Sequence, residues 1–497
     1  MYVEIKFPIS KKFPISLTFF QQYMMDNKKN QYQARLNRYV TALYNGKPDC
    51  VPIRILAEEL AAKHAGFTNF DVAIDHKLQF EVNRKFAIDM GVDAIQTNSI
   101  VNWMGMQKAI GWKGIRYPGI GLPETSCTQW TEPATEDEAF LKAHEYDEFT
   151  EDPTAFLLNK WLPRFTDHLQ PQGQPVTFAH NMSLINGVLA YDQFFDSWKT
   201  AHGELIAAGV VPAVGSVLKA PLDILGDKLR GYVNLCHDLV ERRDKVIAAC
   251  KALMPHLFEV VVANADPTGN IPSIIWMHRG CVPFISPCDF QEVYWTTLKP
   301  IIEELWSRGS QIVLYAEGDW SAHLEAFAEL PDKSIIFHAD KTDVFHAYKV
   351  FGHKFCISGG IPNELLAHGT PHEVRACTKK VIDGVAADGG YILDASALLM
   401  DDANLDNVRA MIDFTRKYGI YPESNELSPD ELKPDARPPG KGIPCLHEHH
   451  RAPGVCFSWV EKKPSFPPIT AHEERIKQVW ENIDRMGYLF CWINLTW

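Results

Sequence analysis

At 497 residues with a formal net charge of −13, the chain is too long for one average domain and too acidic for a nucleic-acid-binding protein. Hydrophobic residues make up 46% and charged residues 22%, which is typical of globular proteins and excludes wholesale disorder. No uninterrupted apolar run is long enough for a membrane-spanning helix, and the 11 cysteines are scattered without a disulfide-framework spacing. We therefore expect a cytoplasmic protein with no signal peptide and no nucleic-acid or membrane partner.

The N-terminal part combines an arm with the first elements of a larger domain. A doubled Lys-Phe-Pro-Ile-Ser pentapeptide within residues 1–34 indicates an extended N-terminal arm. The hydrophobic pattern after it predicts helices and short strands in alternation. The expected elements are a helix over 31–44, a strand over 51–56, a helix over 80–90 and a strand over 94–97.

From residue 205 the alternation becomes regular, with strands rich in Val and Ile followed by amphipathic helices. The predicted strands are 209–215, 258–264, 311–316, 334–338, 354–358 and 390–394. The predicted helices are 229–253, 290–306, 321–329, 344–351, 371–387 and 404–417. Such repeats are typical of parallel β-α units buried on both faces.

The number of units favours a closed (β/α)8 TIM barrel over an open doubly wound sheet. No strand is followed by the Gly-x-Gly-x-x-Gly turn of a dinucleotide-binding sheet. We expect the barrel over residues 35–420, with an irregular insertion near 111–175. Residues 421–497 are expected to form a Pro-rich C-terminal extension that ends in an aromatic helix over 476–497.

In such a barrel the reactive side chains come from the carboxyl ends of the strands. The expected catalytic residues at these positions are Glu317, His338, Asp340, His278 and His180, the last after a short apolar run at 176–179. The expected substrate- or cofactor-binding residues are Asn98, Asn181, Tyr315, Gly359, Gly360, Gly389, Gly390 and Asp394. A satisfied, half-buried side chain is the alternative for each of them.

Glu317 is the best single candidate, because a carboxylate directly after an apolar strand is costly to bury without a partner or a metal. Together with His338 and Cys356 it offers a carboxylate, an imidazole and a thiol, the ligand types that zinc accepts. The spacing matches no standard zinc motif. We expect these three side chains to face one cavity, with His278 and His180 near its mouth.

Two other features have open interpretations. The pairs Gly359-Gly360 and Gly389-Gly390 flank the last two strands, where barrels often bind phosphate, although close backbone approach explains them equally well. The tail segment 445–456 holds two Cys and three His, which suffice in number for a metal site. A His-rich polar loop is the simpler interpretation.

Several segments resemble the uroporphyrinogen decarboxylase superfamily. Residues 37–49 with Val51-Pro52 are similar to its opening segment. The stronger match is Cys356-Ile-Ser-Gly-Gly-Ile-Pro-Asn-Glu-Leu-Leu-Ala-His-Gly-Thr-Pro371, which is followed in family order by residues 389–393 and 407–411. The resemblance spans residues 35–420 with gaps and implies a (β/α)8 barrel.

The superfamily contains two chemistries, and this sequence lacks a hallmark of each. The decarboxylases carry an Arg-Gln-Ala-Gly-Arg-Tyr segment for substrate carboxylates, whereas residues 51–63 here offer Arg54 and Glu58-Glu59. The thiol-methylating, corrinoid-dependent methyltransferases bind zinc through a His-x-Cys that aligns with Tyr315-Ala316-Glu317 here. A later zinc-binding Cys of that branch aligns near Ala395-Ser396-Ala397 and is also absent.

The resemblance therefore implies a divergent corrinoid (cobalamin)-linked methyltransferase, such as a demethylase component acting on a small methoxy compound. The corrinoid would arrive free or on a partner corrinoid protein, because no Asp-x-His-x-x-Gly segment is present. A carboxylate and imidazoles can protonate a leaving oxygen. The alternatives are a decarboxylase-like carboxy-lyase acting on another substrate and a non-catalytic barrel that docks a corrinoid protein. A bound Zn and a homo-oligomer are left open by the sequence.

Overall fold

The computed structural model describes residues 17–96, 100–171, 173–424, 428–434, 436–443 and 451–496, with side chains from residue 27 onward. The doubled pentapeptide of the predicted arm lies outside these residues, as do Cys445 and the three histidines that follow it. The first helix, α1 (Leu17–Leu43), begins well before the helix that we predicted over residues 31–44.

Parallel strands form the centre of the molecule in two hydrogen-bonded sheets. The first sheet has the order β1-β2-β6, with β1 (Arg54–Ile55), β2 (Ala94–Ile95) and β6 (Val211–Pro212). The second has the order β12-β11-β10-β9-β8-β7, with β7 (Val217–Lys219), β8 (Ser273–Met277), β9 (Ile312–Ala316), β10 (Ile335–Ala339), β11 (Cys356–Gly359) and β12 (Tyr391–Ile392). Their side chains are almost all buried, as in parallel sheets covered on both faces.

The two sheets meet at both of their edges. On one side Ile53 bridges Leu393 in parallel fashion, and the Arg54 amide donates to the Leu393 carbonyl at 3.0 Å. On the other side β6 and β7 belong to one continuous segment, so the chain passes from the first sheet directly into the second. The fold is therefore mixed α/β with parallel strands, as the sequence predicted.

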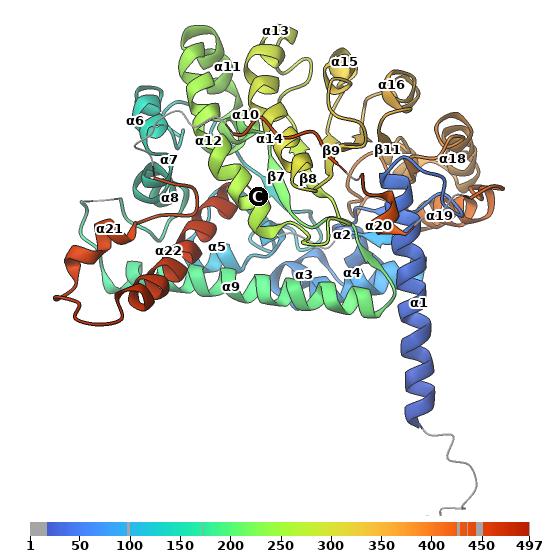
Figure 1. The fold of residues 1–497 in the computed structure, drawn as a ribbon, viewed down its shortest axis with the longest axis horizontal. Helices are drawn as coiled ribbons and strands as arrows, with labels where there is room; N and C mark the ends of the chain where they lie inside the picture. The colour runs from blue at the N-terminus through green and yellow to red at the C-terminus, as the bar shows by residue number, and fades with distance from the viewer. Residues whose placement is uncertain are drawn as a thin grey trace, which may run out of the picture.

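Helices surround these strands (Figure 1). The longer ones are α4 (His76–Met90), α9 (Phe178–Ala207), α11 (Tyr232–Glu241), α12 (Arg243–Asn264), α14 (Thr296–Ser307), α16 (Val344–Phe351), α18 (Pro371–Val385), α19 (Leu405–Tyr418) and α22 (Glu473–Thr496). Short helices include α2 (Glu59–Ala65), α3 (Asn69–Ile74), α5 (Gly105–Ile110), α10 (Pro221–Ile224), α13 (Pro287–Asp289), α15 (Leu324–Phe327), α17 (Asn363–His368), α20 (Pro429–Leu432) and α21 (Trp459–Lys462).

The predicted insertion contains more regular structure than its composition indicated. It carries the small sheet β4-β3-β5, made of β3 (Ile115–Pro118), β4 (Gly121–Leu122) and β5 (Gln129–Trp130). Three short helices follow, α6 (Tyr146–Glu151), α7 (Pro153–Phe156) and α8 (Leu162–Phe165).

Two predicted strands are helices. Residues 258–264 form the end of α12, where Val260 and Val261 are buried and residues 262–264 are exposed. A short apolar run of this kind occurs in helices as well as in strands. Residues 176–179 lie at the start of α9, where the Thr177 side chain caps the helix by accepting from the His180 amide. Among the described residues α12 alone is long and apolar enough to span a membrane, and most of its apolar stretch is packed inside the protein.

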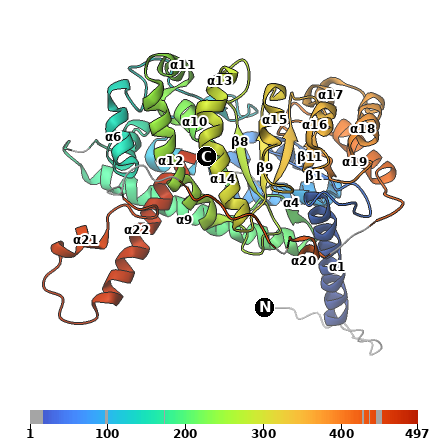
Figure 2. The same cartoon turned by 45° about the horizontal axis from the view of Figure 1, so that its top comes forward.

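The C-terminal helix α22 packs into the molecule instead of extending from it. It runs from the periphery to the centre beside α12 (Figures 1 and 2). The Trp492 ring stacks on His256 of α12 with centroids 4.4 Å apart, and the Tyr488 hydroxyl lies 2.9 Å from His256 Nδ1. The end of the chain therefore belongs to the structure that surrounds the strands.

We expect Tyr488→Phe to lower the free energy of unfolding by about 1–2 kcal/mol, because it removes a buried hydrogen-bond partner of His256. Urea denaturation measures the change. As a control on the same helix, Val479→Ala should change stability by less than about 0.5 kcal/mol, because Val479 is largely exposed. A loss for Tyr488→Phe as small as that for Val479→Ala would show that this contact of α22 does not stabilise the fold.

Candidate active site

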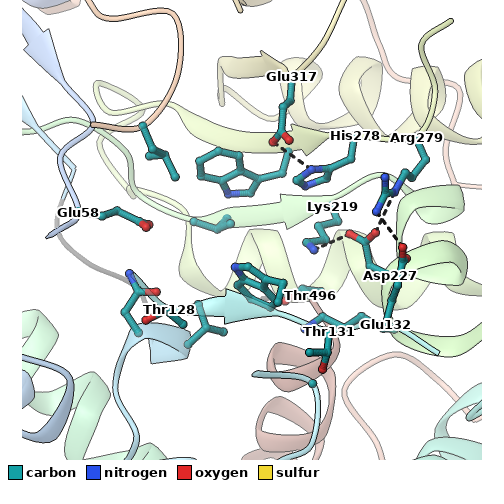
Figure 3. Close-up of a pocket in the computed structure, with 18 of the residues that line it drawn as sticks. Glu58, Thr128, Thr131, Glu132, Lys219, Asp227, His278, Arg279, Glu317 and Thr496 are labelled. Atoms are coloured by element: carbon teal, nitrogen blue, oxygen red, sulfur yellow. Dashed lines mark hydrogen bonds and ion pairs between the residues drawn. The ribbon is translucent and has the colours of Figure 1, made fainter. Parts of the chain in front are cut away.

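A cavity of about 390 Å³ lies at the carboxyl ends of the central strands (Figure 3). Residues directly after β2, β8 and β9, the last residue of β7, and residues of the loops that follow β1 and β12 contribute to its wall. Its polar lining includes Glu58, Gln96, Asn102, Thr128, Thr131, Glu132, Lys219, Asp227, Lys228, His278, Arg279 and Glu317. Its aromatic and apolar lining includes Val101, Trp130, Phe165, Val217, Trp276, Leu398 and Met400. The location is the one at which TIM-barrel enzymes place their chemistry.

His278 and Glu317 face each other across adjacent strands. Because Met277 of β8 pairs with Ala316 of β9, the residues that follow them lie at the same level. The His278 Nδ1 atom is 3.1 Å from Glu317 Oε2 (Figure 3). The other ring nitrogen, Nε2, is buried and has no hydrogen-bond partner among the described residues. With Nδ1 hydrogen-bonded to Glu317, the Nε2–H group of His278 is therefore available to donate a hydrogen bond at the cavity wall.

Each member of the pair shifts the pKa of the other so that the charged form is favoured. Burial lowers the pKa of His278, but the hydrogen bond and negative charge of Glu317 outweigh it and raise the pKa. The Glu317 side chain is 49% exposed at the cavity, so its burial is only partial, and His278 brings its pKa below the ordinary value. Glu317 is therefore the ionised partner, and a protonated His278 is the proton donor of the pair.

A chain of ion pairs forms the adjacent wall (Figure 3). Lys219 Nζ, at the end of β7, is 2.7 Å from Asp227 Oδ2, and Asp227 also lies 3.4 Å from Arg279 Nε. Arg279 reaches Glu132 of the insertion at 3.3 Å. Burial raises the pKa of Asp227, but Lys219 and the other cations lower it overall, so Asp227 stays ionised. Each cation in this chain already has a carboxylate partner.

Two adjacent carboxyl groups form the opposite side of the cavity. Glu58 lines the cavity and Glu59 is buried behind it. Burial raises the pKa of Glu58 to about 7, and burial together with the Glu58 charge raises that of Glu59 to about 8. Glu59 Oε2 has no hydrogen-bond partner among the described residues. The carboxyl groups of Glu58 and Glu59 therefore stay protonated up to about neutral pH.

This pair predicts a stability change with pH. Carboxyl groups with a raised pKa stabilise the folded state while protonated, so their contribution is lost as pH rises from the ordinary value of 4.5 to about 8. Wild type should therefore lose more than about 1 kcal/mol relative to Glu59→Gln across this interval. Urea denaturation at a series of pH values measures the difference. The exposed control Glu124→Gln should follow wild type, and parallel curves for wild type and Glu59→Gln would contradict the assignment.

The structure places His338 below the cavity, not in its wall. Its Nδ1 lies 2.9 Å from Arg54 Nη2 and 3.0 Å from Ser358 Oγ, and its Nε2 is 3.0 Å from the Ser396 carbonyl. Burial and the Arg54 charge lower the pKa of His338 well below its usual value. A neutral, fully bonded and fully buried histidine is a structural residue, which corrects the catalytic role that we predicted.

Asp394 and Tyr315 belong to the same buried layer. Arg54 Nε donates to Asp394 Oδ2 at 2.8 Å, and burial raises the pKa of Asp394 to about 6 in spite of Arg54. The Tyr315 ring lies between Trp276 and His338, and its hydroxyl accepts from the Leu398 amide. Neither side chain lines the cavity. Both stay predictions as substrate-binding residues, and their contacts are those of a cavity floor.

The predicted metal set is not assembled. Cys356 pairs in register with Ile336, whereas His338 pairs with Ser358, so thiol and imidazole belong to different levels of the sheet. Glu317 contacts His278 instead. In the part of the chain that the structure describes, no group of three His, Cys, Asp or Glu side chains is arranged to hold a metal ion.

The two glycine pairs lie where backbone segments approach each other closely. Gly359 has a φ of +86°, and a side chain there would meet the Ala339 carbonyl. Gly389 and Gly390 precede β12 and pack against Asn45 and Gly46, at the end of the strands opposite the cavity. Gly360, like the other three glycines, does not line the cavity. Close approach therefore explains both pairs.

The remaining predicted residues lie elsewhere. Asp340 follows β10 and accepts a hydrogen bond from the Gly318 amide at 2.9 Å, so it supports the loop that carries Glu317. His180 and Asn181 are in the first turn of α9, where His180 belongs to the helix cap. Their predicted position after a strand is wrong because no strand exists there. Asn98 lies outside the described residues.

Several residues that line the cavity were not among the predicted site residues. Lys219 follows an apolar run and fits the strand-end rule, but we ended the predicted strand at residue 215. Glu58 follows β1, where we noted it without assigning a role. Asp227 and Lys228 belong to a π-helical segment, Leu225–Arg230, and Glu132 belongs to the insertion. No local pattern in the sequence indicates that these two segments reach the cavity.

Comparison with known proteins supports the resemblance. Residues 192–418 match the family model described as uroporphyrinogen decarboxylase (URO-D). Among solved structures the chain is similar to a methyltransferase from Methanosarcina mazei, with 16% sequence identity and a TM-score of 0.50 over 78% of this chain and 98% of that chain. At this identity the likeness shows the fold alone. No curated protein matches the sequence.

Proposed function

From the match of residues 192–418 to the uroporphyrinogen decarboxylase (URO-D) family model and from the resemblance described above, we propose that this chain is a corrinoid-linked methyltransferase. Its substrate is a small methylated oxygen compound such as a methoxy compound, from which it removes the methyl group. The observation that carries this proposal is the His278–Glu317 pair in the wall of the cavity.

The proposal includes a closed (β/α)8 barrel. Taken as two halves of one strand, β6 and β7 leave eight parallel strands with a continuous sequence of neighbours. The Ile53–Leu393 bridge supplies a contact between the first and last of them. Closure explains why residues after β1, β8 and β9 line one cavity.

Methyl transfer from an ether requires a leaving oxygen that carries away a pair of electrons. An alkoxide or phenolate leaves slowly unless a positioned acid protonates it. His278 meets this need, because Glu317 keeps it protonated and its Nε2 has no partner in the described part of the chain. Trp276, Trp130 and Phe165 give the cavity apolar surfaces that suit an aromatic ring.

The size of the cavity limits what enters it. About 390 Å³ is near the lower end of the range of about 300–1,000 Å³ for small-molecule pockets. A methyl donor fits this space, and a corrinoid macrocycle would have to cover its mouth from outside. A bound corrinoid supplies the cobalt that accepts the methyl group. The protein supplies the enclosure, the orientation of the donor and the proton from His278.

Zinc does not fit the described residues. The proposed ligands Glu317, His338 and Cys356 are separated, and His338 is occupied by Arg54, Ser358 and Ser396. We therefore derive no step that uses a metal ligand set. Activation by a proton donor instead of zinc agrees with the missing His-x-Cys at residues 315–317.

A carboxy-lyase acting on another substrate is the second candidate. The cations Lys219 and Arg279 in one wall favour it, because a positively charged wall can attract a carboxylate. Uroporphyrinogen itself is disfavoured, because Lys219 and Arg279 already hold Asp227 and Arg54 is buried below the cavity.

The test is incubation of the purified protein with Co(I) cobalamin and a panel of methoxyaromatics, methylamines and methyl thioethers. We expect methylcobalamin, detected by its absorption spectrum, from at least one methoxy donor. Uroporphyrinogen is assayed in parallel for loss of carboxyl groups. Carboxylate loss without methylcobalamin from any donor would overturn the proposal in favour of the lyase.

A further inference from the structure

A buried lysine in the cavity wall has no role in the methyl transfer proposed above. Lys228 lies in the π-helical segment Leu225–Arg230 and is only 2% exposed, yet it lines the cavity. The Trp161 indole donates to its carbonyl at 2.8 Å, which fixes the backbone.

The surroundings of the amine are aromatic. Its Nζ lies 4.5 Å from the ring centroid of Trp130 and 5.6 Å from those of Trp112 and Phe165. Among the described residues this nitrogen has no ion-pair or hydrogen-bond partner, and the only charges that act on it are the more distant ones of Lys219 and Asp227. Aromatic faces at these distances can hold an ammonium group, but they replace its hydration poorly when it is buried.

The nearest charges do not compensate for this burial. Asp227 is the carboxylate next to Lys228 in sequence, but it is already shared by Lys219 at 2.7 Å and Arg279 at 3.4 Å. Burial lowers the pKa of Lys228 well below its usual value, and the positive charge of Lys219 lowers it further. Asp227 acts in the opposite direction and does not restore it.

We infer that Lys228 is a nucleophilic lysine that forms an imine with a small aldehyde or ketone bound in the cavity. The free electron pair of Nζ attacks the carbonyl carbon, and a C–N bond forms. Loss of water then removes the carbonyl oxygen together with the two hydrogens of the neutral amine, a C=N bond replaces the C=O bond, and no atom is oxidised or reduced. Desolvation and a neighbouring cation are the two means by which proteins activate a lysine in this way.

Such a lysine adds a class of substrate to the site. A protonated imine withdraws electrons from the adjacent carbon, which favours loss of a proton or a carboxyl group there. Carbonyl compounds would enter the same cavity as the methyl donor, beside His278. The inference is independent of methyl transfer, because it requires no corrinoid.

The test uses benzaldehyde at limiting concentration and neutral pH, with cyanoborohydride as the hydride source that reduces an imine to a stable secondary amine. We expect one benzyl group per chain, and peptide mapping should place it on Lys228. Exposed lysines are protonated at this pH and should react more slowly. Labelling of exposed lysines with Lys228 unmodified would overturn the inference.

Variants make the assignment specific. Lys228→Met should abolish the fast labelling, whereas Lys245→Met, which removes an exposed lysine, should leave it unchanged. If Lys228→Met does not fold, the labelled position in wild type decides alone. Methylcobalamin formation is measured separately, so failure of the imine test and failure of the methyl-transfer test are distinguishable.

Discussion

Glu317→Gln is expected to lower turnover of a methoxy donor by about 100-fold or more at neutral pH. The carboxylate of Glu317 is what keeps His278 protonated in spite of burial and the nearby Lys219. The amide keeps the size of the side chain but not its charge, so the pKa of His278 falls. Steady-state kinetics over a pH series measures both the loss and its pH dependence.

The pH series separates this explanation from a structural role. In wild type the protonated form of His278 persists to a higher pH than an ordinary histidine, so activity is retained up to that pH and falls above it. In Glu317→Gln the fall should occur at lower pH, and part of the activity should return on acidification. The exposed Glu325→Gln is the matched control and should behave as wild type. A pH-independent loss in Glu317→Gln would contradict the proposed role.

Arg54→Met should lower the free energy of unfolding by about 3–5 kcal/mol, because it leaves a buried carboxylate without its partner. Arg54 is fully buried and donates to Asp394 at 2.8 Å and to Ser358 at 2.8 Å. It also lies against His338 Nδ1. Urea denaturation at neutral pH measures the change.

A double variant tests the reason for the loss. Asp394→Leu in the Arg54→Met background removes the stranded carboxylate, so the double variant should be more stable than Arg54→Met alone. A loss below about 0.5 kcal/mol for Arg54→Met would show that the network under the cavity contributes little. Additive losses in the double variant would contradict the charge argument.

The strand-end rule led to His278 and Glu317, which line the cavity, because the apolar runs of β8 and β9 can be recognised in the sequence. Both strands are short runs of β-branched and apolar residues, and His278 and Glu317 follow them directly. The same rule failed for His338, which precedes the last residue of β10. Its side chain therefore points into the buried layer between strands, where Arg54 and Ser358 meet it.

Other parts of the site depend on contacts that no local pattern encodes. Glu132 and Trp130 reach the cavity from the insertion, and their positions depend on packing against the segment around residue 228. The last two turns of helix α12 carry a β-branched apolar run, of which Val260 and Val261 are buried, and this composition resembles that of a strand. Thr177 is of a residue type that caps helices, but the residue three positions later is His180 instead of the Glu or Gln of the usual capping signature, so the sequence did not mark the start of α9 clearly.

The most direct test of the proposed function compares single-turnover methyl transfer to Co(I) cobalamin by wild type and His278→Gln. The donors are methyl ethers whose leaving oxygen ranges from an acidic phenol to an aliphatic alcohol. If His278 protonates the leaving oxygen, the rate lost in the variant will increase as the leaving group becomes more basic. The same proportional loss for every donor, or no methylcobalamin from wild type with any of them, would contradict the proposal.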